Sequence, residues 1–252
     1  MTQTGVAAVE VAPTKVWASP LSASADEVKR YRGLWEERGI SIAAMQALLF
    51  GRPDLVMFSS DGARRDTLEY LRGMIRLASL LGATVLVFGS PKNRIKGALS
   101  NEEADAIAVP FFRALGQEAH EHGVCLCIEP NAPEYGCDYV TDCAQGMKLV
   151  RKVGHPGFGL HLDAACMTLV KDDPLESFAG AGGHLRHFHI SEPWLGRIGS
   201  GGVDHKGFSR ALKESGYGNL LSIEMKALSG PDNAPNVRAA LEFSIRQYLG
   251  AG

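Results

Sequence analysis

Four side chains in the second half of the 252-residue chain could bind one divalent cation together. They are three carboxylates and one imidazole: Glu129, Asp163, His189 and Glu224. Each stands at or near the end of an apolar run that is typical of a buried strand. If these runs are neighbouring parallel strands, their carboxyl ends meet at the edge of the sheet where α/β enzymes have their active sites. The oxygen-rich set favours Mn²⁺, with Mg²⁺ or Co²⁺ as alternatives, over a closed structural zinc site.

Four further polar residues could support these ligands or bind a substrate. His161 and His187 each precede a ligand by two residues, so they share its face of the strand one layer deeper. They are either hydrogen-bonded core histidines or contacts of the ligands and substrate. Glu10 ends the first predicted strand and could point into the site or form a cap or ion pair. Gln46 ends the second predicted strand and could donate a hydrogen bond to a substrate.

Basic residues follow several of the same strands. Lys92 and Arg94 lie in the loop after the third predicted strand, whereas Arg197 and Lys226 follow two of the ligand strands. At the catalytic face they could hold a phosphate or a carboxylate. Solvation at the surface is the alternative for each of them.

Seven strand–helix units must position these residues. We predict strands over 5–12, 40–46, 84–89, 124–129, 158–163, 185–191 and 220–224, each followed by a segment with helical apolar spacing. The alternation predicts a parallel sheet, either a barrel or a doubly wound open sheet. No Gly-x-Gly-x-x-Gly follows a strand, and ligand-type residues end several strands in succession, which favours the barrel. We therefore predict one α/β domain over 1–252, a TIM-type (β/α) barrel.

Composition excludes several other classes of protein. The net charge is −2 and no basic stripe is present, so we expect no nucleic-acid partner. No apolar run approaches the roughly 20 residues that span a bilayer, and residues 1–11 do not read as a signal peptide. The five cysteines lack zinc-knuckle spacing, which indicates that they are small buried hydrophobic residues. We expect a reduced, cytoplasmic protein.

Four phrases resemble the sugar isomerase/epimerase family that has the xylose-isomerase-like barrel: 127–131 (CIEPN), 159–163 (GLHLD), 187–192 (HFHISE) and 221–225 (LSIEM). That family includes ketose 3-epimerases, hydroxypyruvate isomerase and inosose dehydratase, and is distantly related to endonuclease IV. The resemblance covers nearly the whole chain and implies a divalent metal on the four residues named first. It also implies that Glu129 and Glu224 are the catalytic carboxylates and that Glu192 and Arg197 lie close to a carbohydrate substrate.

Two departures from the family pattern modify this expectation. The phrase Glu-Val-Ala-Pro, which begins at Glu10, belongs to the second strand in the family, so we expect a barrel that lacks the family's first β/α unit. An incomplete barrel would leave an apolar seam, which predicts a homo-oligomer. Cys166 stands where ketose epimerases carry a substrate-contacting histidine, so the identity of the sugar does not transfer.

The resulting hypothesis is proton transfer at a carbon next to a carbonyl. One glutamate removes the proton to form an enediolate, and the other returns a proton from the opposite face. The substrate would be a ketose, a keto-cyclitol or a phosphate of either. Three alternatives stay open: a keto-cyclitol dehydratase, a catalytically degenerate barrel that serves as a binding or partner subunit, and an endonuclease IV-like phosphodiesterase. The last is disfavoured because that chemistry needs a three-metal His/Asp cluster and a basic groove.

Overall fold

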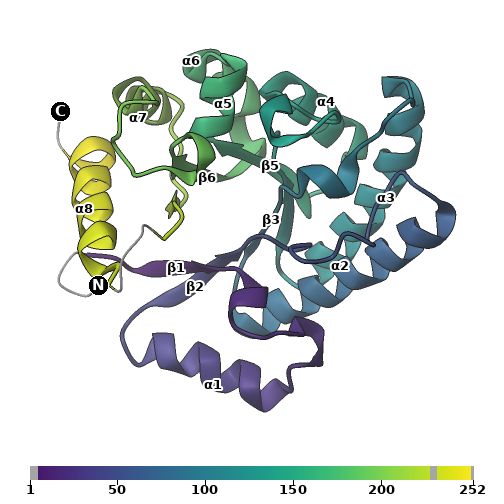
Figure 1. Ribbon diagram of the computed structural model, residues 1–252, viewed down its shortest axis with the longest axis horizontal. Helices are drawn as coiled ribbons and strands as arrows, with labels where there is room; N and C mark the ends of the chain where they lie inside the picture. The colour runs from purple at the N-terminus through teal and green to yellow at the C-terminus, as the bar shows by residue number, and fades with distance from the viewer. Residues whose placement is uncertain (1–4, 228–231, 251–252) are drawn as a thin grey trace.

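A seven-stranded parallel sheet organises the computed structural model, which describes residues 5–227 and 232–250. The strands lie side by side in chain order, from β1 to β7. Their bounds are β1 Ala8–Val11, β2 Ser41–Met45, β3 Val85–Phe88, β4 Cys125–Ile128, β5 Phe158–Asp163, β6 Leu185–Ser191 and β7 Leu221–Glu224. Figure 1 shows helices surrounding this sheet on its outer side. Their bounds are α1 Ala25–Glu36, α2 Asp61–Leu81, α3 Asn101–Glu121, α4 Cys143–Val153, α5 Ala164–Val170, α6 Pro174–Ala181, α7 His205–Glu214 and α8 Ala234–Ser244.

The sheet curves into a nearly closed barrel, as Figure 1 shows. Within the described residues, β1 and β7 are its two edge strands. Glu10 on β1 nevertheless reaches His187 and His189 on β6, at 2.9 and 3.0 Å, so the first strand faces the sixth across the interior. The TIM-type α/β barrel predicted from the sequence is confirmed. None of the described helices is both long enough and apolar enough to cross a bilayer.

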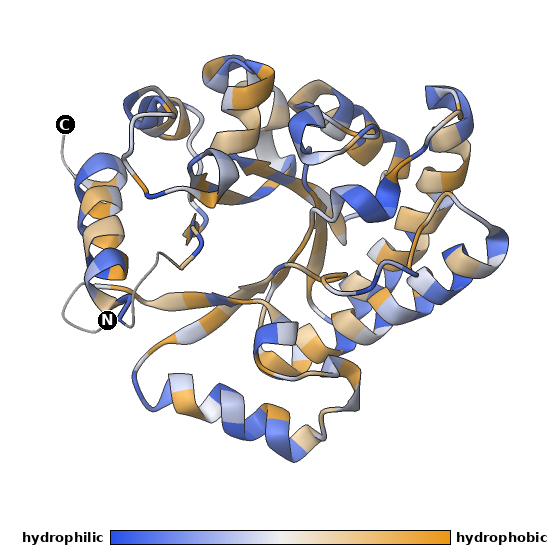
Figure 2. Cartoon of the chain, in the orientation of Figure 1, coloured by the Kyte–Doolittle hydropathy of each residue, from blue (hydrophilic) through white to orange (hydrophobic). Residues whose placement is uncertain are grey.

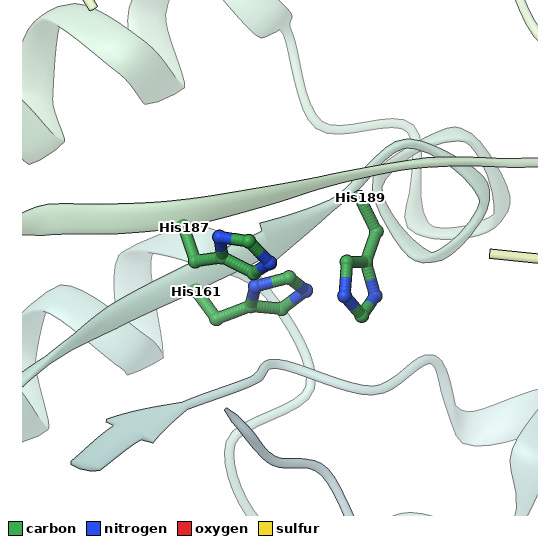
Figure 3. Close-up of side chains that lie close together, drawn as sticks. All are labelled: His161, His187 and His189. Atoms are coloured by element: carbon green, nitrogen blue, oxygen red, sulfur yellow. The ribbon is translucent and has the colours of Figure 1, made fainter. Parts of the chain in front are cut away.

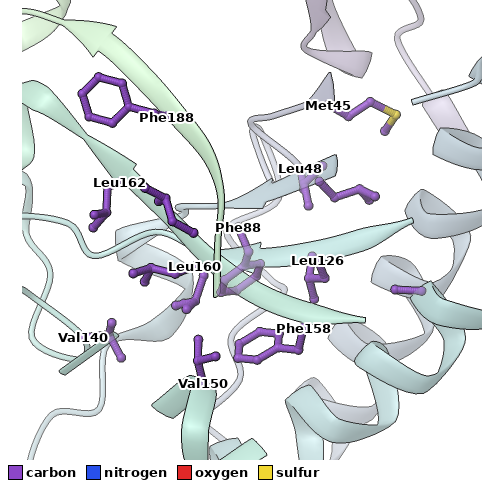
Figure 4. Packing of buried hydrophobic residues seen from close by; sticks show 14 of the residues in the cluster. Met45, Leu48, Phe88, Leu126, Val140, Val150, Phe158, Leu160, Leu162 and Phe188 are labelled. Carbon is purple, nitrogen blue, oxygen red and sulfur yellow. The ribbon is translucent and has the colours of Figure 1, made fainter. Parts of the chain in front are cut away.

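Strand residues alternate between the helices outside and the barrel interior. Leu126 and Ile128 of β4 are fully buried in a hydrophobic cluster that includes Phe112 of α3. Figure 4 shows this cluster, and Figure 2 shows largely apolar strands between helices of mixed polarity. Because side chains alternate along a strand, Cys127 and the following Glu129 face inward. The register that buries the apolar face therefore also delivers the carboxylate to the interior.

Local sequence signals define most helix ends. α1 and α3 both begin with a capping box, in which Ser24 or Ser100 pairs reciprocally with the glutamate three residues later. α2 ends at Gly82, whose φ of 81° is the left-handed conformation that a side chain disfavours. α3 continues through Pro110, although proline is unfavourable inside a helix. Pro110 is exposed, so the carbonyl that loses its donor lies on the solvent side of the helix.

Arg94 has a structural position that the sequence did not predict. Its side chain is fully buried, and it donates hydrogen bonds to the carbonyl oxygens of Glu129, at 2.6 Å, and of Phe88, at 3.2 Å. It also donates to Oδ1 of Asn131 at 2.9 Å. The candidate role of Arg94 in binding a substrate anion is therefore wrong, because its donors are directed at the chain itself. Arg94 joins the carboxyl ends of β3 and β4.

Replacing Arg94 with Met will destabilise the barrel, because the buried carbonyl groups of Phe88 and Glu129 lose their donors. We expect the free energy of unfolding to fall by about 2–4 kcal/mol. Urea denaturation followed by circular dichroism measures this loss. The control is Lys92→Met, an exposed residue of the same turn, which should change stability by less than about 0.5 kcal/mol. Equal stabilities of the two variants would show that Arg94 is dispensable.

Candidate metal and active site

The four predicted cation ligands come together at the carboxyl ends of β4 to β7. Glu129 directly follows β4, and Asp163 and Glu224 are the last residues of β5 and β7. All three line one pocket of about 370 Å³. His189 lies in β6, where it pairs in register with Asp163, and is 1% exposed. The inward face of four successive strands therefore builds the site.

Distances between the ligand atoms suit a single cation. One donor atom each from Glu129, Asp163 and His189 lie within 4.8 Å of one another. Oε2 of Glu224 lies 3.3 Å from Nδ1 of His189. Carboxylate oxygens with one imidazole nitrogen are a donor set that divalent cations such as Mn²⁺ accept.

The orientation of His189 leaves one ring nitrogen available to a cation. Its Nε2 lies 3.0 and 3.1 Å from the two carboxylate oxygens of Glu10, which accept its hydrogen bond. Its buried Nδ1 has no hydrogen-bond partner among the described residues and points toward Glu224. Burial opposes the charged form, but the carboxylates of Glu10 and Glu224 hold the pKa of His189 well above its ordinary value, so a cation at Nδ1 would replace a proton there. With that proton displaced, the hydrogen bond from Nε2 to Glu10 keeps the remaining proton on Nε2 and directs the Nδ1 lone pair toward the pocket.

Glu10 is held as a buried carboxylate anion by two histidines. It accepts a second hydrogen bond, from Nε2 of His187 at 2.9 Å. Burial raises the pKa of Glu10, but the charge of His189 and the two hydrogen bonds keep that pKa well below its ordinary value. Glu10 does not line the described pocket, so its contacts are with the histidines.

The carboxylates of the pocket repel one another in the absence of a cation. Burial raises the pKa of Glu129 to about 8, and the charges of Asp163 and Glu224 add to this rise. Burial and the charge of Glu224 also raise the pKa of Asp163. A divalent cation between these groups would reverse the balance by favouring the ionised forms.

Asp163 is fixed on both oxygens by its surroundings. Its Oδ1 accepts the backbone N–H of Cys166 at 2.7 Å, which makes it the N-cap of α5. Its Oδ2 accepts the hydroxyl of Ser191 at 2.5 Å. The sequence prediction contained neither α5 nor this contact. Ser191 follows His189 by two residues, and counting by twos along β6 would have placed it on the same face.

Two of the predicted substrate-binding residues line the pocket, Gln46 and Glu192. The carboxylate of Glu192 is almost fully buried, with Oε1 at 3.2 Å from Nε2 of His205. Its Oε2 accepts the backbone N–H of Gly202 at 3.1 Å. Glu192 therefore anchors the glycine-rich loop that follows β6, and its side chain also faces the pocket.

The other predicted substrate-binding residues lie elsewhere. Lys92, Arg197 and Lys226 are exposed and are not among the described residues that line the pocket. His161 and His187 are buried below the ligands, together with Glu10.

The pocket wall also contains residues outside the predicted set of metal ligands and substrate-binding residues. Tyr135 and Trp194 line it with their rings 4.9 Å apart in an edge-to-face arrangement, and the backbone N–H of Trp194 donates to the Tyr135 hydroxyl. Asn131 and Cys166 line it as well. Asn131, Tyr135 and Trp194 lie in loops and short turns, where no periodicity indicates the direction of a side chain, and Cys166 lies in α5, which was not predicted.

Comparison with known proteins places the chain in a family. A family model described as "Xylose isomerase-like TIM barrel" matches residues 1–247. The chain belongs to this family. An L-ribulose 3-epimerase from Methylomonas sp. (strain DH-1) is 23% identical over 217 residues, which cover 86% of this chain and 72% of the relative. A ketose 3-epimerase from Arthrobacter globiformis is 24% identical over 159 residues, which cover 62% of this chain and 54% of the relative.

Solved structures share the fold of this xylose isomerase-like barrel. A D-psicose 3-epimerase crystallised in the presence of D-fructose superposes with a TM-score of 0.80 at 19% identity, covering 99% of this chain and 91% of that one. An L-ribulose 3-epimerase superposes with a TM-score of 0.81 at 19% identity, and the match covers 98% of this chain and 86% of that one. The IOLI protein with a binding zinc atom superposes with a TM-score of 0.76 at 19% identity, and the match covers 98% of this chain and 89% of that one.

Replacing Glu10 with Gln will weaken metal binding without removing a ligand of the pocket. The amide cannot accept as strongly from Nε2 of His189, so the ring is no longer held in the tautomer that exposes Nδ1. We expect the affinity for Mn²⁺ to fall about 10–100-fold, measured by isothermal titration calorimetry. The control is Glu242→Gln on the exposed side of α8, which should bind Mn²⁺ like the wild type. Unchanged affinity in Glu10→Gln would disprove the orienting contact.

Replacing Gly89 with Ala will displace the Glu129 carboxylate, because a methyl group at Gly89 would overlap Oε2 of Glu129. We expect Mn²⁺ affinity to fall by about tenfold or more, since ligand geometry is disturbed while the charge is kept. The matched control is Gly33→Ala in α1, where an added methyl group meets nothing within 4 Å. If Gly89→Ala bound Mn²⁺ as well as Gly33→Ala does, the tight contact between Gly89 and Glu129 would be refuted.

Proposed function

We propose that this protein is a divalent-metal-dependent epimerase or isomerase of a ketose, and that Glu129 and Glu224 exchange protons with the substrate. The observation that carries the proposal is the convergence of these two glutamates on one pocket, together with Asp163 and Nδ1 of His189. Two carboxylates from different strands can address a bound substrate from different sides. That arrangement is what inversion at a carbon centre requires.

The comparisons support this class of reaction. The curated relatives quoted above are named L-ribulose 3-epimerase and ketose 3-epimerase, and the superposed structures include D-psicose and L-ribulose 3-epimerases. The IOLI protein, which shares the fold, is described with a bound zinc atom. We therefore propose that Glu129, Asp163, His189 and Glu224 hold a divalent cation. Mn²⁺ is the preferred candidate because most of these donors are oxygens.

The two glutamates are placed for proton transfer. Both line the pocket, Glu129 just after β4 and Glu224 at the end of β7, and the side chain of Glu224 is 22% exposed. When bound, a divalent cation supplies Lewis-acid polarisation of the substrate carbonyl. One glutamate takes the proton from the adjacent carbon, giving the enediolate of the sugar, and the other delivers a proton to the opposite face. Delivery to the neighbouring carbon, with transfer of a proton between the two enediolate oxygens, gives isomerisation instead.

The charge of the pocket favours an unphosphorylated sugar. Among the described residues, its lining contains no Lys or Arg, while Glu129, Asp163, Glu192 and Glu224 all contribute to it. A phosphate group would meet this acidic wall without a cationic side chain to bind it. Asn131 and Gln46 offer the neutral amide donors that sugar hydroxyls accept, and the Tyr135–Trp194 pair offers an apolar wall.

Replacing Glu129 or Glu224 with Gln will abolish exchange of the substrate α-proton with solvent. Each substitution removes one of two obligatory proton carriers, so we expect exchange rates to fall by about 10²–10⁴-fold in both variants. Incubation of the wild type with Mn²⁺ and a ketose panel in D₂O, followed by mass spectrometry, measures deuterium incorporation. Glu242→Gln should exchange normally. Normal exchange in both active-site variants would eliminate the two-glutamate mechanism, and a product lighter by one water would indicate a dehydratase.

A further inference from the structure

A second group of side chains with metal-ligand chemistry lies below the pocket. His161 on β5 and His187 and His189 on β6 face one another inside the barrel, as Figure 3 shows. One ring nitrogen from each lies within 4.8 Å of the other two. All three side chains are at most 2% exposed. Glu10 on β1 adds a carboxylate, with Oε2 at 2.9 Å from Nε2 of His187 and 3.0 Å from Nε2 of His189.

His161 is the feature that hydrogen bonding within the described chain does not explain. Its side chain is fully buried, and neither ring nitrogen has a hydrogen-bond partner among the described residues. Full burial of the ring favours its neutral form. A neutral imidazole carries one donor and one acceptor, and leaving both unsatisfied in the interior is unfavourable. A leucine of similar volume would have avoided this cost.

The spacing of these groups fits a tetrahedral ion. Zinc bonds to imidazole nitrogen at about 2.0–2.1 Å, which separates neighbouring donor atoms in a tetrahedron by about 3.3 Å. The Glu10 oxygen lies within a few tenths of an ångström of that separation from the nitrogens of His187 and His189. The ring centroids of His161 and His189 are 4.1 Å apart, and one ring nitrogen of His161 lies within 4.8 Å of one on His187 and one on His189.

We propose that His161, His187, His189 and Glu10 form a second, inner metal site that binds a nitrogen-preferring divalent cation such as Zn²⁺. Three imidazoles and one carboxylate are the donors of a closed zinc site, in contrast to the oxygen-rich pocket above. Because the site is buried on all sides, it leaves no position for a substrate. Its ion would hold β1, β5 and β6 together.

The inner site shares His189 with the pocket. A neutral imidazole offers a lone pair on only one nitrogen, so an ion on Nε2 leaves the proton on Nδ1. That nitrogen points toward Glu224, where the proposed function needs a free lone pair. Zinc in the inner site will therefore exclude Mn²⁺ from the pocket. This consequence rests on the proposed function, whereas zinc binding by the inner site does not.

The first experiment separates the two sites. The full chain with Glu129→Gln and Glu224→Gln loses two pocket carboxylates but keeps all four inner ligands. After removal of metals with a chelator, it is refolded and titrated with Co²⁺. We expect one Co²⁺ per chain with the intense visible absorption of a tetrahedral ion, displaced by Zn²⁺. Absence of that absorption would overturn the inner site.

The second experiment tests His161 directly. Adding His161→Leu to the same chain removes both orphaned nitrogens at similar volume. We expect Co²⁺ affinity to fall by more than about 100-fold, because even residues that only orient a ligand are worth 10–100-fold. The control is His120→Ala, since the exposed His120 has its ring 5.9 Å from that of His155 and could bind Co²⁺ at the surface. Unchanged absorption in the His161→Leu chain would overturn the proposal.

The third experiment uses the unaltered chain and does not depend on how His161→Leu folds. X-ray absorption of the protein loaded with one equivalent of Zn²⁺ counts the imidazoles around the ion. Three imidazoles support the inner site, and one imidazole with carboxylates places zinc in the pocket and overturns it. The zinc-loaded protein is then titrated with Mn²⁺ and followed by electron paramagnetic resonance. Tight binding of Mn²⁺ beside inner zinc would overturn the exclusion that the shared His189 implies.

Discussion

The carboxylate of Glu10 is the contact on which the site depends. It comes from the first strand of the described sheet and accepts hydrogen bonds from His187 and His189 on the sixth. A buried anion of this kind is tolerated only where its partners are in place, since removing one of them leaves an unpaired charge in the interior. The same contact brings β1 across the barrel and turns Nδ1 of His189 toward the pocket. The same hydrogen bonds therefore connect β1 to β6 and orient His189 as a metal ligand.

Electrostatic repulsion among the pocket carboxylates is the second constraint. Glu129, Asp163 and Glu224 are brought together by strand geometry, and burial raises the pKa of the first two. The chain compensates locally, through the Ser191 hydroxyl and the α5 N-terminus on Asp163 and through Arg94 on the backbone of Glu129. These contacts hold the groups in place without cancelling their charge, which is the condition under which a divalent cation binds well.

Much of the site could be predicted because strand alternation is a strong rule. Counting by twos from Glu129 and identifying apolar runs sufficed to bring Asp163, His189 and Glu224 to one end of the barrel. Residues that depend on loop geometry could not be predicted in this way. Arg94 has the sequence context of a surface loop, yet the turn that begins at Ser90 directs it into the interior. Helix α5 escaped prediction because its N-cap is also the last residue of β5, so no polar break separates the two elements.

The long sequence separation of the Glu10 contacts has a consequence for biosynthesis. Residue 10 leaves the ribosome when its partners, 177 and 179 residues later, have not been made. Contacts of such separation are late and slow to form, because chain entropy is lost before the contact stabilises anything. During synthesis the early strands pair with their sequence neighbours, while the Glu10 carboxylate stays hydrated. The metal-binding end of the barrel is therefore completed only after the sixth strand has been translated.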